Sequence, residues 1–407
     1  MKIIHAHKYF YYRRGAERYM LDLMRMQEAR GHQVIPFSMH YPKNLPSAWE
    51  NFFVSEIQTE QGSSGLFHAW KQTMRALWSW EAKRKFASLV DAVSPDIVHV
   101  HNIYTHISPS ILKVCQERGI PVVMTVHDYA LASANYALWD EVKKKSMDIN
   151  HIGLFATART KFIKHSYLAT FVLELIESWH RFCQQYEKPI NMFLANSNFT
   201  ALVLTSIGIK KEKIKVLYPF TEIPKNVSYK DEGFVLYLGA LEDYKGVDVL
   251  IDAMKSFPKT ILKIAGLGPY EQILRLRARG MKNIEFMGFA EGTARTELLS
   301  SARVCVVPSI WHEPFGLSAV EAMAHMTPVI VSDAGGLKEI VEPGVSGEVF
   351  KSGNSKDLVS KLRLFIDNAD YARSLAQDAY KRAKELGDPE KHYHQVMDIY
   401  SEVLQED

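Results

Sequence analysis

The chain has 407 residues, of which 47% are hydrophobic and 23% are charged, so composition excludes a disordered protein and leaves room for two domains. No uninterrupted apolar run approaches the roughly 18 residues of a membrane span, and the charged start of the chain does not resemble a signal peptide. The three cysteines match no metal or disulfide spacing, so we expect a cytoplasmic protein that is soluble or lies on the inner face of the membrane.

Charge divides unevenly between the two halves of the chain. Residues 1–205 have a formal net charge of +6, whereas residues 206–407 have −3. A basic N-terminal half favours an anionic partner there, such as a membrane surface or a phosphate-bearing acceptor. Nucleic acid would fit the charge alone, but the sequence has no nucleic-acid motif and no interleaved aromatic and basic platform, so we expect no nucleic-acid partner.

The chain begins with a strand–helix–strand pattern. Strands are predicted over Lys2–Ala6 and Gln33–Ser38, with a helix over Gly15–Arg30 between them. Gly15 stands where the loop meets the helix, as in phosphate-binding turns. One glycine before a helix is also explained by a simple tight turn.

Two later segments combine tryptophan with basic residues. The stretch Leu66–Val93 is predicted to be helical and bears Trp70, Trp78 and Trp80 among lysines and arginines; a second segment, 159–182, is basic and then apolar. Tryptophan beside cations suits a lipid interface. A buried aromatic stripe with a solvated basic face explains the first pattern equally well.

Histidines accompany the next two predicted strands. Asp96–Asn102 places His99 and His101 on one face, and Pro121–Val126 is followed directly by His127. His127 therefore lies at the carboxyl end of a strand, the edge where open α/β sheets bind ligands. Any one of the 16 histidines is more often structural than catalytic. Residues 130–187 have no clear pattern beyond an apolar helix over Tyr167–Phe182.

The second half repeats the alternation of strands and helices. Strands are predicted near 234–239, 260–265, 283–287, 303–307, 328–332 and 346–350, with helices between them and a last helix over Asp388–Asp407. Such alternation predicts a second doubly wound parallel α/β domain.

The most informative stretch follows the strand Val304–Val307. Glu313 lies in a Pro- and Gly-containing loop, and Glu321 lies one turn into a helix predicted over Leu317–His325. Between them, the amides of Phe315, Gly316 and Leu317 should be free at the helix N-terminus, and Gly316 should let a ligand approach the backbone. An anion cradle flanked by two carboxylates suits a diphosphate with sugar hydroxyls at both ends, that is, a nucleotide sugar. A solvated loop glutamate and a helix-dipole partner are the plainer interpretation.

The segment Glu313–Glu321 resembles the signature of retaining glycosyltransferase family 4, whose fold is GT-B. The resemblance implies an N-terminal Rossmann-like acceptor-side domain over residues 1–222 and a C-terminal nucleotide-sugar domain over residues 223–388, facing each other across a cleft. The last helix, residues 389–407, would then return to the N-terminal domain.

The resemblance also implies roles for single residues. Glu313 and His127 would hold the donor sugar, while Glu321 would accept the ribose hydroxyls. Lys245, with the amides near Gly316, would stabilise the departing diphosphate.

Two positions depart from the family pattern. In the segment Gly239–Gly246, Ala240 stands where the family has a diphosphate-binding arginine, and Arg14 precedes Gly15 where the family has a second glycine. We expect Gly239, Gly15 and Arg14 to face the donor phosphates, with Arg14 supplying the missing cation from across the cleft. The alternative is that Arg14 is a solvated loop charge.

The resemblance implies a retaining, metal-independent hexosyltransferase that uses a nucleoside diphosphate sugar and a glycan or polyprenyl-linked acceptor in cell-surface polysaccharide synthesis. No Asp-x-Asp occurs in the chain, so we expect no metal and no cofactor. A nucleotide-sugar epimerase of the same fold and a catalytically inactive sugar-nucleotide-binding subunit remain alternatives.

Overall fold

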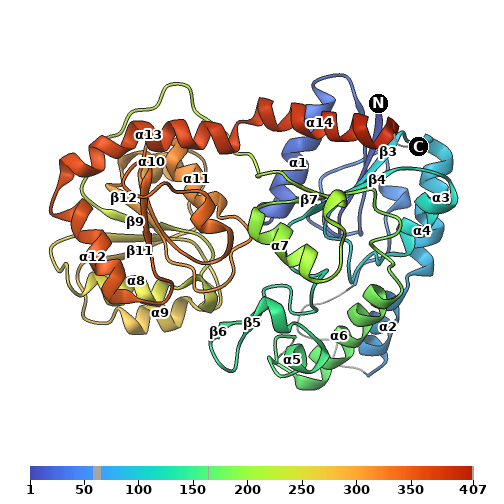
Figure 1. Ribbon diagram of the computed structural model, residues 1–407, viewed down its shortest axis with the longest axis horizontal. Coiled ribbons are helices and arrows are strands. Elements are labelled where there is room, and N and C mark those ends of the chain that lie inside the picture. The colour runs from blue at the N-terminus through green and yellow to red at the C-terminus, as the bar shows by residue number, and fades with distance from the viewer. Residues whose placement is uncertain (58–65, 164, 406–407) are drawn as a thin grey trace.

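The computed structural model describes residues 1–57, 66–163 and 165–405, which form two lobes side by side (Figure 1). Each lobe is built on a six-stranded parallel sheet. The predicted pair of doubly wound parallel domains is therefore confirmed. The boundary at residue 222 stays a prediction, although the last strand of the first sheet and the first strand of the second lie on either side of it.

The N-terminal sheet has the order β2-β1-β3-β4-β7-β8. Its strands are β1 (Lys2–Ala6), β2 (Gln33–Phe37), β3 (Ile97–Val100), β4 (Val122–Val126), β7 (Met192–Ala195) and β8 (Ile214–Val216). The helices of this lobe are α1 (Gly15–Glu28), α2 (Leu66–Leu77), α3 (Trp80–Val93), α4 (Ser110–Glu117), α5 (Leu154–Ala158), α6 (Tyr167–Phe182) and α7 (Asn198–Ser206). A short hairpin of β5 (Trp139–Asp140) and β6 (Lys145–Ser146) lies outside the sheet.

The C-terminal sheet has the order β11-β10-β9-β12-β13-β14. Its strands are β9 (Val235–Leu238), β10 (Leu262–Ala265), β11 (Ile284–Gly288), β12 (Val304–Val307), β13 (Val329–Ser332) and β14 (Gly347–Phe350). The helices are α8 (Val247–Met254), α9 (Glu271–Arg277), α10 (Gly292–Ser301), α11 (Leu317–Ala324), α12 (Ser355–Ile366) and α13 (Ala369–Gly387).

Strand order places the ligand edge in each lobe. Successive strands are added toward one edge of the sheet and then toward the other, and the change occurs between β1 and β3 in one sheet and between β9 and β12 in the other. In open α/β sheets the crevice at such a switch point, outside the carboxyl ends of the strands, is where ligands bind. The loops after these four strands carry most of the predicted site residues.

The last helix, α14 (Pro389–Gln405), continues from α13 and runs across the N-terminal lobe (Figure 1). Its buried residues Val396, Ile399, Tyr400 and Val403 join a core cluster with Ile3, Tyr19 and Leu23. The two lobes are thus connected twice, once by the chain before β9 and once by α14.

One local prediction was wrong in detail. The helical stretch predicted over Leu66–Val93 is two helices, because Ser79 leaves the helical conformation and its hydroxyl caps α3 by accepting a hydrogen bond from the Ala82 amide. The turn after β13 continues as a 3₁₀ helix over Gly335–Glu339. No helix among the described residues is long and apolar enough to cross a membrane.

Candidate active site between the lobes

Lys245 and Glu313 meet at the switch point of the C-terminal sheet. Lys245 ends the 3₁₀ turn Asp243–Lys245, and the following Gly246 has φ +68°. A Cβ on Gly246 would lie 2.0 Å from the Pro308 carbonyl oxygen. Only glycine lets this backbone lie directly against the loop that follows β12, which brings the lysine to the glutamate.

Four contacts fix the carboxylate of Glu313. The ammonium of Lys245 donates to both of its oxygens at 2.9 Å, and the Ser309 hydroxyl and the Trp311 indole N–H donate to Oε2 at 2.9 and 2.8 Å. The same ammonium lies 4.9 Å from the centre of a Trp311 ring. Glu313 is therefore an oriented acceptor beside a cation.

The loop into α11 leaves amides free, and its glycine has a packing role. Gly316 has φ +113°, and a Cβ there would lie 2.3 Å from Leu337 Cδ2. The glycine is needed for its left-handed backbone and for packing against Leu337, not for approach of a ligand to that face. In the described parts of the chain no hydrogen bond engages the amides of Phe315, Gly316 or Leu317, so the anion-binding end of α11 remains available.

Glu321 is buried and already paired. Its Oε2 accepts from Arg295 of α10, and its Oε1 lies 3.8 Å from an Arg18 nitrogen of α1. Arg18 belongs to the other lobe, so this contact joins the two lobes.

Arg14 also reaches across the cleft. Its guanidinium lies 3.3 Å from Oε1 of Glu242, two residues beyond Ala240, where the family arginine is missing. Gly15 is exposed, and a Cβ there would meet nothing within 4 Å, so there is open space at the start of α1. Gly239 is tightly packed instead, with a Cβ position 3.0 Å from the Tyr237 hydroxyl.

His127 extends the N-terminal edge as part of a chain of imidazoles. Its Nε2 lies 3.1 Å from Nδ1 of His101, His101 Nε2 lies 3.1 Å from Nδ1 of His5, and His5 Nε2 lies 2.8 Å from Oε1 of Gln27. Burial lowers the pKa of His127 to about 3 and that of His5 to about 4, and it also lowers the pKa of His101. The imidazoles are therefore neutral at physiological pH.

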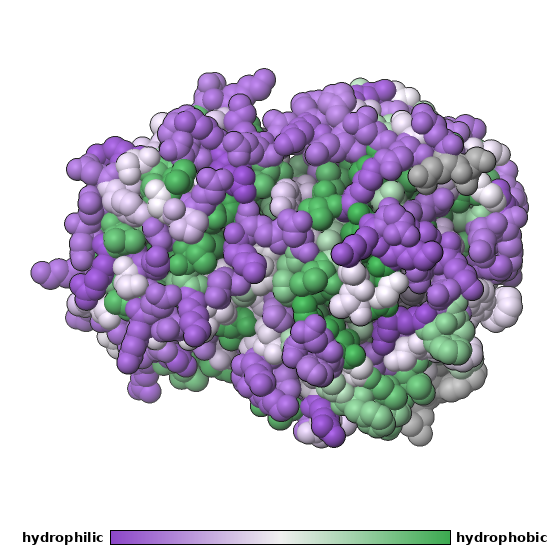
Figure 2. All heavy atoms as spheres, in the orientation of Figure 1, coloured by the Kyte–Doolittle hydropathy of each residue, from purple (hydrophilic) through white to green (hydrophobic). Residues whose placement is uncertain are grey.

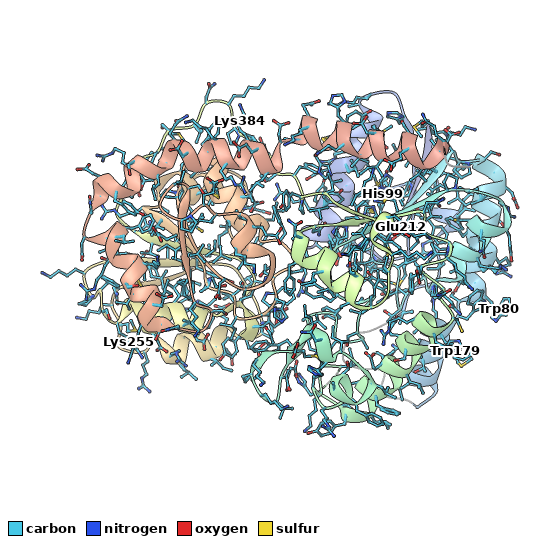
Figure 3. All side chains as sticks on the ribbon, in the orientation of Figure 1. Trp80, His99, Trp179, Glu212, Lys255 and Lys384 are labelled. Carbon is cyan, nitrogen blue, oxygen red and sulfur yellow. The ribbon has the colours of Figure 1, made fainter. Side chains whose placement is uncertain are left out.

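His99, which Figure 3 labels in the N-terminal lobe, belongs to the same buried group. Nitrogens of His5, His99 and His101 lie within 4.8 Å of one another, which is close enough for three metal ligands. However, all six ring nitrogens already have hydrogen-bond partners, those of His99 being Tyr400 and Thr125. The cluster is a satisfied hydrogen-bond network, and its residues do not fit a metal site.

Unsatisfied polar atoms gather beside His127. Asp128 accepts from the Ala130 amide at 3.0 Å and from Asn102 at 3.1 Å, and burial raises its pKa to about 6. In the portion of the chain the structure describes, His7 Nε2, His106 Nε2 and Asn102 Oδ1 are buried without a partner. Buried polar groups without partners are uncommon, so this edge offers donors and acceptors to a polar ligand.

The segment that the sequence left unassigned contacts the C-terminal lobe. The indole of Trp139 in β5 donates to Asp243 at 3.3 Å, the Ser146 hydroxyl donates to the Ile310 carbonyl at 3.1 Å, and the Met147 carbonyl lies 2.9 Å from Nε2 of His312. The β5–β6 hairpin therefore holds both loops that carry Lys245 and Glu313.

The structure thus joins Lys245 to Glu313 and leaves His127 on the opposite lobe with no contact to either among the described residues. Sequence reasoning missed Trp311, Ser309, Arg295 and Glu242. Trp311 could have been found from its place two residues before Glu313. Arg295 is on a separate helix and gave no signal.

Two protein-family models match the chain. A sequence model described as Glycosyltransferase Family 4 matches residues 13–223, and one described as Glycosyl transferases group 1 matches residues 220–382. An uncharacterised glycosyltransferase of Methanocaldococcus jannaschii is 28% identical over 78% of this chain and 76% of its own length. A phosphatidyl-myo-inositol mannosyltransferase of Mycobacterium leprae is 34% identical over 42% of this chain and 46% of its own.

Solved structures agree in fold. A sucrose-phosphate synthase from Thermosynechococcus elongatus superposes with a TM-score of 0.71 at 18% identity, with both chains covered completely. Anabaena HepE in complex with UDP and glucose gives a TM-score of 0.66 at 18% identity, covering 98% of this chain and 99% of its own. At these identities the likeness establishes the GT-B fold.

Proposed function

Because the chain belongs to glycosyltransferase family 4, we propose that it moves a hexosyl unit, with retention of configuration, from a nucleoside diphosphate sugar to a glycan or lipid-linked acceptor. The observation that carries this proposal is the fixed Lys245–Glu313 pair beside the free amides at the start of α11. It places a cation, an anion-binding helix end and a carboxylate that can accept hydrogen bonds from hydroxyls in one site.

The donor would lie along the C-terminal wall. Glu313 accepts hydrogen bonds from sugar hydroxyls, and Glu321 accepts them from the ribose. Lys245 and the amides of Phe315–Leu317 stabilise the diphosphate as the glycosidic bond breaks and negative charge develops on it. Gly239 supports this wall by its close packing on Tyr237.

A second cation is needed because a diphosphate carries at least two negative charges and Ala240 supplies none. Arg14 lies 3.3 Å from Glu242. When the donor binds, the Arg14 guanidinium would leave this carboxylate and pair with a donor phosphate. Two cations would then do the work of charge neutralisation without a metal.

Retention would come from attack on the same face that the diphosphate leaves. The acceptor oxygen bonds to the anomeric carbon as the bond to the phosphate oxygen breaks, and the departing phosphate takes the hydroxyl proton. This scheme needs no carboxylate nucleophile, unlike the paired carboxylates of retaining glycosidases.

The acceptor would approach from the N-terminal wall, near Asp128 and its hydrogen-bond partner Asn102, whose Oδ1 is unpaired. Two similar proteins, the phosphatidyl-myo-inositol mannosyltransferase and an O-antigen chain mannosyltransferase of Escherichia coli, have names that point to lipid or glycan acceptors. They support a role in cell-surface polysaccharide synthesis.

An anionic membrane surface is the partner we propose for the outward face of α6. Leu168, Leu175, Trp179 and Phe182 are exposed along this helix, Phe182 by 81%. Figure 2 shows hydrophobic side chains over this region, and Figure 3 shows Trp179 and Trp80 pointing outward at the same side of the N-terminal lobe. Tryptophan on an apolar helix face is typical of interfacial helices.

The charges on and near α6 favour binding to a negatively charged membrane. Both of its carboxylates, Glu174 and Glu177, are turned inward and buried, so the outward face carries no acid. Arg159 and Lys161 lie just before the helix. The side chains of Trp70 and Lys71, and residue 164, are outside the described residues and add nothing to this argument.

Product analysis tests the enzymatic proposal. The protein is incubated with UDP-, GDP- and ADP-sugars, chosen by thermal shift with the corresponding nucleotides, with and without a polyprenyl-phosphate glycan. Glycosylated acceptor with a retained anomeric configuration, unaffected by EDTA, is expected. An altered free sugar without acceptor would establish an epimerase, and binding without any product would establish an inactive subunit.

Vesicle flotation tests the membrane surface. Vesicles with anionic lipid should carry the protein upward at low salt and release part of it at high salt. Trp179→Ser with Phe182→Ser should abolish flotation, while exposed Leu202→Ser on α7 should not. Equal flotation with neutral vesicles, or none with either, would contradict the assignment.

A further inference from the structure

The imidazole chain behind His127 has a fixed direction set by Gln27. In the observed orientation, the Gln27 amide oxygen faces His5 Nε2 at 2.8 Å, so that nitrogen carries the proton. Its Nδ1 is then an acceptor and receives the Nε2 proton of His101. His101 Nδ1 in turn receives the Nε2 proton of His127. Each neutral imidazole has one donor and one acceptor, so one end determines the other.

The other half of the amide holds Gln27 in that orientation. Its NH₂ group lies 3.4 Å from the Tyr400 hydroxyl of α14, and that hydroxyl lies 2.6 Å from Nδ1 of His99. The hydroxyl accepts from Gln27 and donates to His99, whose Nε2 then donates to Thr125 at 2.7 Å. Gln27, His5, His99 and His101 are all at most 1% exposed, so water does not compete for these bonds.

The remaining nitrogen of His127 faces outward. The residue is only partly buried, and its Nδ1 has no hydrogen-bond partner among the residues the structure describes. With the proton on Nε2 donated inward, Nδ1 offers a lone pair at the carboxyl end of β4. A lone pair accepts a hydrogen bond from a hydroxyl and repels a phosphate oxygen.

We infer that Gln27 is a positioning residue that acts through His5 and His101 to fix His127 as the Nε2-protonated tautomer, so that His127 accepts a hydrogen bond from a hydroxyl of the donor sugar and does not contact its phosphates. The identity of the ligand rests on the proposed function. The tautomer and the part played by Gln27 do not.

The tautomer is tested directly in the wild-type protein. Long-range ¹H–¹⁵N spectra of ¹⁵N-histidine protein at pH 7.5 distinguish protonated from unprotonated ring nitrogens, and loss of signals in His127→Gln assigns that ring. Protonated Nε2 with unprotonated Nδ1 is expected. Protonated Nδ1 would overturn the inference, whether or not any activity is found.

Gln27→Met removes the anchor with little change of shape, and the tautomers of His127 should become mixed. The kcat/KM for the donor sugar should fall roughly tenfold, as for other residues that orient an imidazole. Affinity for the free nucleoside diphosphate should be unchanged, because this ligand lacks the donor sugar that His127 contacts. Gln27→Glu keeps the acceptor oxygen and should keep the tautomer, and Gln185→Met, elsewhere in the same lobe, is the matched control. An unchanged tautomer in Gln27→Met, or equal losses for sugar donor and free diphosphate, would contradict the role.

Discussion

The two walls of the cleft are built by different physical means. The C-terminal wall consists of charged pairs, Lys245 with Glu313 and Arg295 with Glu321. Around His127, the N-terminal wall consists of neutral imidazoles whose pKa values burial lowers, with His127 at about 3. The cations Arg14 and Arg18 of this lobe contact the C-terminal wall instead. A charged wall can neutralise a departing diphosphate, whereas a neutral wall can recognise hydroxyls without attracting phosphate.

The two walls also differ in how far apart in the sequence their residues lie. Glu313, Trp311 and Ser309 come from a single loop. The chain behind His127 draws on β1, α1 and β3. Variants in the first wall should therefore change affinity and rate, and variants in the second should change tautomer and pH dependence.

The largest effect on rate is expected for Lys245→Ala. Removing the cation nearest the departing diphosphate should lower kcat on the order of 1,000-fold at saturating donor. Steady-state kinetics with the identified donor measures this, with exposed Lys338→Ala as the control. A loss below about tenfold would show that the charged wall does not act in the transition state.

Arg14→Ala tests whether the N-terminal lobe contributes charge after all. If Arg14 neutralises phosphate across the cleft, kcat should fall on the order of 100-fold, and Ala240→Arg should recover part of it. The neighbouring exposed Arg13→Ala is the matched control. A kcat within about twofold of wild type would leave Arg14 a solvated loop charge.

Glu321→Ala should weaken nucleoside diphosphate binding by roughly 1.5–3 kcal/mol, because a charge-assisted hydrogen bond to the ribose is lost. Calorimetric titration measures the affinity, and exposed Glu297→Ala on α10 serves for comparison. Unchanged affinity would mean that Glu321 only neutralises Arg295 and Arg18.

The smallest effect per residue is expected for the histidines of the N-terminal wall, as a loss of free energy of unfolding when the pH falls. A histidine whose pKa is lowered in the native state, such as His127, His5 or His392, binds fewer protons there than in the unfolded chain. Its stabilising contribution is complete above about pH 6.5 and is lost as the pH falls, by about 1.4 kcal/mol per pH unit for each residue. Asp128, with its pKa raised to about 6, acts oppositely and contributes stability that disappears as the pH rises through 6.

Urea unfolding at intervals between pH 7.5 and 5 should therefore show stability falling with acidity. His5→Gln should reduce the slope by about one proton in this window, and exposed His151→Gln should leave it unchanged. A stability independent of pH would show that these imidazoles bind as many protons in the native protein as in the unfolded chain.

Much of the fold was predictable because its periodicities are strong. The strands Lys2–Ala6 and Val304–Val307 and the helix over Tyr167–Phe182 appear where the sequence indicated them. The break at Ser79 was missed because apolar spacing continues through it, and only the capping bond shows that the helix ends.

By itself, the sequence determined the two parallel domains, the family signature around Glu313 and the apolar helix over Tyr167–Phe182, since each depends on residues close together in the chain. Tertiary structure alone decided which lysine meets which glutamate, that Arg14 and Arg18 cross the cleft, and that Gln27 orients His127. Those relations join residues up to hundreds of positions apart, and no local spacing encodes a distance between two lobes or the direction of a buried hydrogen-bond chain.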